Sequence, residues 1–231
     1  MILRGTLLPA IPQRMLQIDE TTIGDHFSLA TSDFCFYVWE YTAGQRYDFS
    51  PTNQLISNLK IKPTQITANP RRDHYKQQAI DHSAAALRGL VQRAWVEQIG
   101  TFVPMPTSKI PGHQDFDDRI QRLLRAAFGP LNADIRPMLE QTESTAADHE
   151  SADRLSHAAL RAITRIDEAH AAAPLRANIA LVDDVLNSGK HFKVAQELLS
   201  QRFPGTPVIG IFIARCIRSN PLVDLIAQTR T

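Results

Sequence analysis

Cysteine, long apolar runs and a leader-like start are scarce in this sequence, and each absence excludes a class of protein. The two cysteines, Cys35 and Cys216, lie far apart and show no metal-ligand spacing, so we expect two buried thiols in a reducing compartment. No run of about 18 apolar residues is present, which predicts no transmembrane helix. Pro9 and Pro12 break the first apolar stretch, so we expect no signal peptide and a cytoplasmic protein.

A strong net charge is also absent. The 25 Lys and Arg residues nearly balance the 24 Asp and Glu residues, which gives a net charge of +1 at pH 7. The overall field of such a protein would not attract a polyanion, so we expect no nucleic-acid partner. An anionic small molecule would have to be held by a local pocket.

The apolar share of the chain, 43%, is sufficient for a real core. Helical periodicity and apolar runs predict helices at about 75–94, 115–128, 152–171 and 190–202, and strands at 101–104, 179–182, 208–213 and around Ile135. Strands and helices alternate from about residue 74 onward. This alternation predicts an α/β fold with an open, mostly parallel sheet flanked by helices.

The N-terminal part of the chain differs in its pattern of aromatic residues and prolines. Aromatic residues gather at 34–41, where we expect a strand, and a short helix is expected at 53–60. Residues 62–72 contain two prolines and are expected to form a linker. We therefore predict an N-terminal α+β appendage over residues 1–97 and an α/β domain over residues 98–231. The aromatic cluster suits a core or a partner surface, and stacking on a ligand stays open.

The candidate site follows the apolar strand at 179–182. Asp183 and Asp184 come directly after it, and ligands of open α/β sheets bind at this end of the strands. Two carboxylates there can hold a divalent cation or accept hydrogen bonds from sugar hydroxyls. The small-residue turn that follows, 187–189, opens a helix and offers backbone N–H groups to a phosphate. The combination suits a sugar phosphate.

This segment has two alternative interpretations. A P-loop needs glycine at the position of Asp184 and Ser or Thr at the position of His191, so the sequence departs from that motif twice. A plain strand–turn–helix with solvated acids is the other alternative. Two adjacent acids after four apolar residues favour a functional site over that alternative.

The segment Val182–His191 resembles the phosphoribosyl-pyrophosphate (PRPP) motif of the type I phosphoribosyltransferases, in which two acids follow an apolar strand and precede a small-residue loop. Phe102–Lys109 is similar to the strand and pyrophosphate loop of the ComF-like branch of that family. The similar segments lie within residues 98–215. The resemblance implies a phosphoribosyltransferase-like fold.

The resemblance also implies roles for individual residues. Asp183 and Asp184 would face the ribose hydroxyls, with magnesium beside them. The loop would cradle the 5′-phosphate through Asn187, Ser188, Gly189, Lys190 and His191. Ser108 and Lys109 would approach the pyrophosphate, through a cis peptide in their loop. The polar segment 139–153 takes the place of the mobile lid that excludes water during transfer.

The function implied is a glycosyltransferase that moves phosphoribose from PRPP to a nitrogenous base. The alternative is a non-catalytic PRPP or nucleotide sensor that regulates a partner, as in a bacterial conflict system. No Lys or Arg lies between Pro137 and Asp153, while five acids do, which is atypical for a lid that closes on pyrophosphate. Residues 1–97 would form a hood over the acceptor or a contact between two copies of the chain in a homodimer.

Overall fold

The computed structural model describes residues 7–145 and 155–218. Its centre is a six-stranded mixed sheet in the order β1-β2-β8-β7-β3-β4. The strands are β1 (Leu16–Gln17), β2 (Cys35–Thr42), β3 (Gly100–Pro104), β4 (Asp134–Ile135), β7 (Asn178–Leu186) and β8 (Val208–Ile217). All neighbouring pairs are parallel except β1 and β2, which are antiparallel. The predicted α/β fold with a mostly parallel sheet is therefore confirmed.

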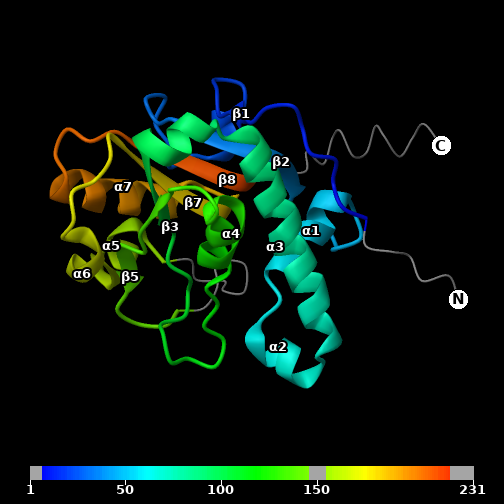
Figure 1. The fold of residues 1–231 in the computed structure, drawn as a ribbon. Helices are drawn as coiled ribbons and strands as arrows, with labels where there is room; N and C mark the ends of the chain where they lie inside the picture. Colours follow the sequence, from blue (N-terminus) through cyan, green and yellow to red (C-terminus); the bar gives the residue numbers. More distant parts are fainter. Residues whose placement is uncertain (1–6, 146–154, 219–231) are drawn as a thin grey trace, which may run out of the picture.

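Helices flank the sheet, and a small hairpin sheet lies to one side of it (Figure 1). The helices are α1 (Pro51–Leu59), α2 (Pro63–Ala68), α3 (Arg71–Leu90), α4 (Arg119–Phe128), α5 (His157–Ile163), α6 (Glu168–Ala171) and α7 (Lys190–Arg202), with short turns η1 (Ile23–Asp25) and η2 (Trp95–Ile99). The hairpin sheet pairs β5 (Leu139–Gln141) with β6 (Thr164–Ile166) in antiparallel register.

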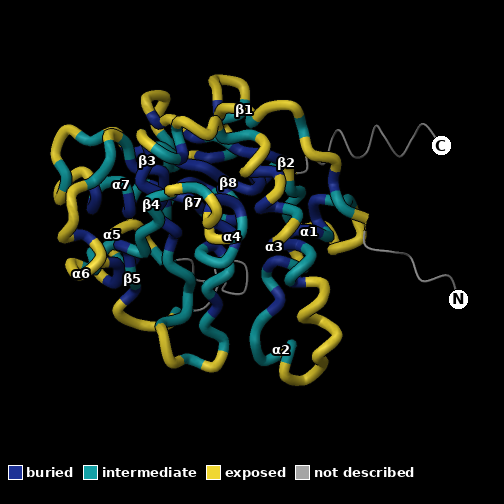
Figure 2. The backbone as a smooth tube through the Cα atoms, viewed as in Figure 1, coloured by how far each residue is buried: buried dark blue, intermediate teal, exposed yellow. Residues whose placement is uncertain are grey.

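The central strands are buried on both faces, because successive side chains of a strand point to opposite sides. In β7, Ala180 and Val182 belong to the apolar cluster that includes residues of α1, α3 and α4. Ile179 and Leu181 belong to the cluster that includes residues of α5 and α7. Figure 2 shows the buried segments gathered on the sheet and on the helix sides that face it, with α2 and several loops exposed.

Residues on both sides of the expected boundary at 97 share one sheet and one core. Strand β2 pairs with β8 over Cys35–Thr42, so the N-terminal part supplies a strand of the main sheet. Val38 and Trp39 of β2 pack in the same apolar cluster as Phe102 of β3. Residues 7–97 are thus built into the α/β unit and do not form a separate appendage in the described structure. The burial of Trp39 also places part of the aromatic cluster in the core.

Three sequence-based expectations need correction. The helix expected at 152–171 is divided, because β6 leaves the helical path to pair with β5. The linker expected at 62–72 contains α2, because Pro63 stands at the first helical position, where its missing N–H costs nothing. The loop expected at 139–153 begins with strand β5, and its residues 146–153 lie outside the described residues.

Other expectations concern the backbone, the thiols and the membrane. No cis peptide bond occurs in residues 7–145 and 155–218, so the loop of Ser108 and Lys109 has none, contrary to what the resemblance implied. Cys35 and Cys216 are buried free thiols, as expected. Within the described ranges, every helix is too short or too polar to cross a bilayer.

The buried lysine of α3 gives a test of this packing. Lys76 is 1% exposed, and its Nζ donates to the carbonyls of Leu59 and Ile61 and to Asp117. We expect Lys76→Met to lower the free energy of unfolding by about 3 kcal/mol, because two buried carbonyls lose their donor and Asp117 loses one of its two cations. Denaturant titration measures this change. The control Arg72→Met, at an exposed position of the same helix, should change stability by less than about 0.5 kcal/mol, and equal effects of the two variants would contradict the assignment.

Candidate functional site

A cavity of about 950 Å³, called the large cavity below, opens where β2, β3, β7 and β8 end. Because these strands are parallel, the loops after their carboxyl ends meet at one edge of the sheet. The large cavity is lined by all nine residues to which the resemblance assigns a contact with the ligand or metal. These are Ser108, Lys109, Asp183, Asp184, Asn187, Ser188, Gly189, Lys190 and His191. The fold thus brings the segments 108–109 and 183–191 to one site.

Asp184 is buried and held by two cations. Arg119 donates to its Oδ2 from Nε at 2.8 Å and from Nη2 at 2.5 Å, and Nζ of Lys60 lies 3.2 Å from its Oδ1. Burial alone would raise the pKa of Asp184, but the charges of Arg119 and Lys60 outweigh it and hold that pKa well below its ordinary value. Asp184 is therefore an ionised, fully paired carboxylate.

The pair extends into a chain of alternating charges. Arg119 also donates from Nη1 to Oδ2 of Asp117 at 3.0 Å, and Nζ of Lys76 lies 2.7 Å from the same oxygen. Burial would lower the pKa of Arg119, but the two carboxylates beside it raise that pKa above its ordinary value. The chain connects α3, the start of α4 and the end of β7. It fixes the position of Asp184 relative to the N-terminal helices.

Asp183 differs sharply from its neighbour. The backbone N–H of Asp184 donates a hydrogen bond to Oδ1 of Asp183 at 2.8 Å. Burial and the adjacent charge of Asp184 raise the pKa of Asp183 to about 6, against the weaker opposing charges of His191 and Arg119. Its carboxylate is half-buried and lines the large cavity. Asp183 is the carboxylate of the two that can accept hydrogen bonds from a ligand.

The turn at 187–189 is clamped from one side by an N-terminal loop. Nδ1 of His26 hydrogen-bonds with the carbonyl of Asn187, and the backbone N–H of Ser28 donates to the carbonyl of Ser188 at 2.9 Å. Gly189 has φ +86°, and a Cβ there would lie 2.6 Å from the Leu29 side chain. A larger residue would therefore clash and be strained. The carbonyls of Asn187 and Ser188 thus face the N-terminal loop and accept hydrogen bonds from it. Backbone N–H groups of the turn and of the first turn of α7 can donate to an anion.

The two lysines of the site contact the residues that flank segment 146–154. Nζ of Lys109 donates to the carbonyl of Thr145 at 2.6 Å, and the N–H of Thr145 donates to the carbonyl of Ser108 at 2.8 Å. Nζ of Lys190 donates to the carbonyl of Leu155. The residues on both sides of segment 146–154 are thus tied to the site. Three of its five acids, Asp148, Glu150 and Asp153, lie outside the described residues.

The acid pair does not fit a magnesium ion held directly by both carboxylates. A ligand oxygen of Asp184 would have to leave Arg119 or Lys60, whose positive charges would also repel the ion. The described part of the chain contains no group of three or more His, Cys, Asp or Glu residues arranged to hold a metal. We therefore derive no step from a metal bound by the expected ligands Asp183 and Asp184.

Sequence reasoning missed the cations that surround the acid pair. Lys60 follows α1, Arg119 begins α4, and both contact Asp184 across long stretches of chain. The acids at 115, 117 and 118 just before Arg119 were a visible signal of a charged helix start. Tyr41 of the aromatic cluster lines the large cavity, together with Tyr47 outside that cluster, which keeps the stacking alternative open.

The two adjacent carboxylates should respond oppositely to neutralisation. Asp184→Asn removes one of the two carboxylates that pair with the partly buried Arg119, and the carboxylate that pairs with Lys60, so we expect the free energy of unfolding to fall by about 3 kcal/mol. Asp183→Asn should instead stabilise the protein above about pH 6, because the folded state disfavours the charged form of Asp183.

The raised pKa of Asp183 determines how the stabilisation by Asp183→Asn changes with pH. The ordinary pKa of Asp183, 3.8, is raised to about 6 on folding, so the wild-type protein loses stability as pH rises through that window. The gain from Asp183→Asn should vanish below about pH 4, where both forms are neutral. Denaturant titrations at several pH values measure it. A loss of stability in Asp183→Asn that is equal at all pH values would contradict this division of roles.

Comparison with known proteins leaves the site unassigned. No protein-family model matches the chain, and no curated protein matches it. The arrangement of side chains around the large cavity is therefore the basis for what the site binds.

Proposed function

We propose that the protein binds PRPP, or a nucleotide through its 5′-phosphate, in the large cavity and transfers phosphoribose to a nitrogenous base. One observation carries the proposal. The acid pair, the small-residue turn and the Ser108–Lys109 loop, expected from separate parts of the sequence, line one cavity at the carboxyl edge of the sheet. Each has the chemistry that one part of PRPP requires.

The charge around the large cavity supports an anionic ligand. Its lining includes six Lys and Arg residues against four Asp residues. Two of those carboxylates, Asp117 and Asp184, are already paired with cations of the protein. The volume, about 950 Å³, is within the range of ligand-binding pockets. The local field thus favours a polyanion, although the net charge of the chain is only +1.

In this proposal each group of residues contacts a different part of PRPP. The N–H groups of 187–191 would donate to the 5′-phosphate, with Lys190 and His191 adding side-chain donors. Asp183 would accept hydrogen bonds from ribose hydroxyls. Ser108 and Lys109 would contact the pyrophosphate, so that Lys109 stabilises the charge that develops as pyrophosphate leaves the anomeric carbon. Arg119 and Lys60 act through Asp184 and position the strand end.

The large cavity also has lining residues that suit the acceptor. Tyr41 and Tyr47 line it together with Gln45 and Ser57. An aromatic ring beside neutral hydrogen-bonding groups can stack on a nitrogenous base and bind its edge. The base would then lie in the same cavity as the ribose, as a transfer reaction requires. In this proposal the N-terminal part of the chain supplies the residues that contact the acceptor.

A second function, a PRPP or nucleotide sensor without transferase activity, is favoured by the pairing of Asp184. Both of its oxygens contact cations of the protein, so one carboxylate of the expected two is left for the ribose. In the described part of the expected lid, Glu140 pairs with Arg165, and no cation of the segment 139–145 is available for pyrophosphate. These features are compatible with binding that is not followed by transfer.

Isothermal titration calorimetry with PRPP tests the ligand that both functions share. We expect saturable binding, measured with and without magnesium, and at least tenfold weaker binding in Asp183→Asn, which loses a charged acceptor but stays folded. The matched control is Asp118→Asn, a carboxylate that does not line the large cavity. No binding of PRPP, or equal affinities of wild type and Asp183→Asn, would contradict both functions.

Pyrophosphate release separates the enzyme from the sensor. The wild-type protein is incubated with PRPP and a panel of nucleobases, and released pyrophosphate is measured against time. We expect release that depends on one class of base and falls at least tenfold in Lys109→Ala, because the leaving group loses a charged donor. PRPP binding without release across the panel would favour the sensor.

A further inference from the structure

The turn at 187–189 is oriented by a histidine from a distant part of the chain. His26 is fully buried, and its Nδ1 hydrogen-bonds with the carbonyl of Asn187. A carbonyl oxygen only accepts hydrogen bonds, so Nδ1 carries the proton and donates. Two residues later, the backbone N–H of Ser28 donates to the carbonyl of Ser188 at 2.9 Å. These two contacts are called the clamp below.

The clamp determines where the N–H groups of the turn point. In a planar trans peptide, the C=O and the N–H of one unit point in opposite directions. The carbonyl of Asn187 shares its unit with the N–H of Ser188, and the carbonyl of Ser188 shares its unit with the N–H of Gly189. Residues 187–189 line the large cavity, whereas residues 26–29 do not. The clamp thus turns both N–H groups away from the N-terminal loop, as an anion in the large cavity requires.

The ring of His26 suits this position only while it is neutral. Its Nε2 is buried and has no hydrogen-bond partner among the described residues. On the neutral ring this nitrogen is a lone pair, whereas on the protonated ring it is a second N–H donor. A buried donor without an acceptor is costly, and more so when it carries charge. Protonation therefore favours conformations in which the ring reaches water and releases the carbonyl of Asn187.

The charges around His26 also favour its neutral form. Burial lowers the pKa of His26, and the charges of Arg215 and Arg218 lower it further, against the hydrogen bond to Asn187 and the charge of Asp25. Asp25 is itself paired with Arg215, at 3.1 Å. Other charged groups on the elements packed against this loop have partners of their own, namely Glu40 with Arg215, Lys193 with Asp33, and Lys190 with the carbonyl of Leu155.

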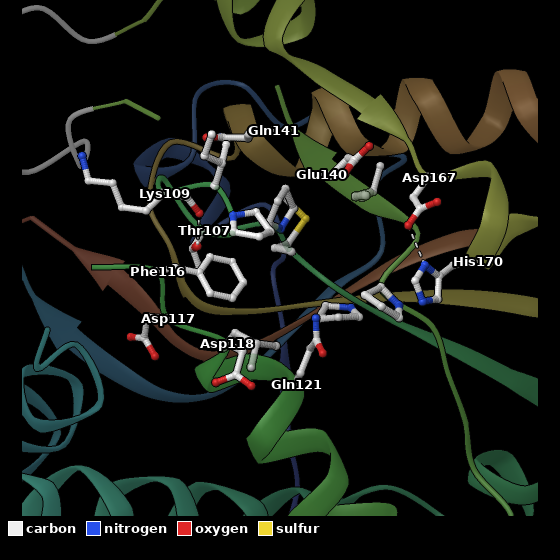
Figure 3. A pocket seen from close by; sticks show the side chains of 18 residues that line it. Thr107, Lys109, Phe116, Asp117, Asp118, Gln121, Glu140, Gln141, Asp167 and His170 are labelled. Atoms are coloured by element: carbon white, nitrogen blue, oxygen red, sulfur yellow. Dashed lines mark hydrogen bonds and ion pairs between the residues drawn. The ribbon is translucent and has the colours of Figure 1, made fainter. Parts of the chain in front are cut away.

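The hydrogen-bond partner of His26 distinguishes it from a histidine such as His170. Nδ1 of His170 lies 2.6 Å from Oδ2 of Asp167, and Figure 3 shows this contact. A carboxylate partner forms an ion pair when the ring is protonated, whereas the carbonyl of Asn187 forms none. Protonation of His26 is therefore not compensated by its own partner.

We propose that His26 is a positioning residue of the anion site and that its protonation in acid lowers the affinity of the site. With the neutral ring, the clamp directs the N–H groups of Ser188 and Gly189 to the ligand. With the protonated ring, the turn is released and a smaller fraction of the molecules can bind. The effect on ligand affinity rests on the proposed function, whereas the clamp itself does not.

Spectra of the ligand-free protein test the clamp. The ring of His26 and the backbone amides of 187–191 are followed in the labelled full chain from about pH 7.5 to about pH 5. We expect a step in the amide shifts below pH 6.5 that has the midpoint of the His26 ring, because folding favours the neutral ring. The step should be absent from His26→Asn, whose side-chain amide donates to the same carbonyl without titrating.

The matched control is His82→Asn. His82 also contacts a backbone carbonyl, that of Pro9, but does not line the large cavity, so this variant should keep the wild-type step. The midpoints of the ring and the amides are compared within the wild-type protein, so this result needs no variant. Amides of 187–191 that do not follow the His26 ring, or that titrate identically in His26→Asn, overturn the proposal.

Calorimetry with ribose 5-phosphate tests the effect on binding. Between about pH 7.5 and about pH 5, we expect the dissociation constant of the wild type to rise at least tenfold more than that of His26→Asn. The ligand phosphate and the titratable groups of the site, among them Asp183 and His191, are the same in both proteins. The ratio therefore isolates His26, and equal rises in the two proteins overturn the proposal.

A third variant tests the positioning role at neutral pH. His26→Leu keeps a side chain of similar size but has no donor, so we expect at least tenfold weaker binding of ribose 5-phosphate than in His26→Asn at about pH 7.5. Equal affinities of the two variants overturn the positioning role. If ribose 5-phosphate binds to none of these proteins, the proposed function is contradicted, and the amide titration still decides whether His26 controls the turn.

Discussion

The burial of the Asp184 carboxylate at the end of β7 sets the requirement that the surrounding structure meets. Removing a carboxylate from water costs several kcal/mol unless a cation and hydrogen bonds compensate. Arg119 and Lys60 supply that compensation, and Asp117 and Lys76 extend it into the helical layer. The position of the sheet edge therefore depends on side chains from α3, from the start of α4 and from the residue that follows α1.

This requirement also explains why two neighbouring acids have different properties. Arg119 and Lys60 both pair with Asp184. Asp183 lies beside the negative charge of Asp184 in a partly buried position, and both factors raise its pKa. One carboxylate stabilises the fold, and its neighbour is available to a ligand. Sites that bind ligands often keep such strained electrostatics, because the ligand supplies what the free protein lacks.

The sequence predicted best what is decided locally. The apolar runs of β7 and β8, the periodicity of α7 and the turn at 187–189 that opens α7 depend on neighbours along the chain, and the structure has them at the expected places. Strand β6 was missed because it exists only through pairing with β5, and no local pattern encodes that partner. Pro63 can end a helix or begin one, and the sequence around it does not distinguish the two, whereas in the structure it begins α2.

The same distinction holds for the site. The acids and the turn follow one another in sequence and could be predicted, whereas Arg119 is 65 residues from Asp184 and meets it only when α4 packs beside β7. His26 is 161 residues from Asn187 in the sequence, and their hydrogen bond forms only when the N-terminal loop packs beside the 187–189 turn. No local sequence pattern predicts that contact. The charge of the large cavity is likewise a product of folding, since residues from five segments create it.

The central claim is that the turn at 187–189 and the first turn of α7 receive a phosphate while the loop after β3 receives pyrophosphate. Backbone amide chemical shifts of the labelled protein, followed during a titration with PRPP, test this claim most directly. The account predicts saturable shifts, with one dissociation constant, concentrated at Ser108, Lys109 and 187–191. Absence of saturable shifts, or shifts concentrated away from these two loops, would contradict it.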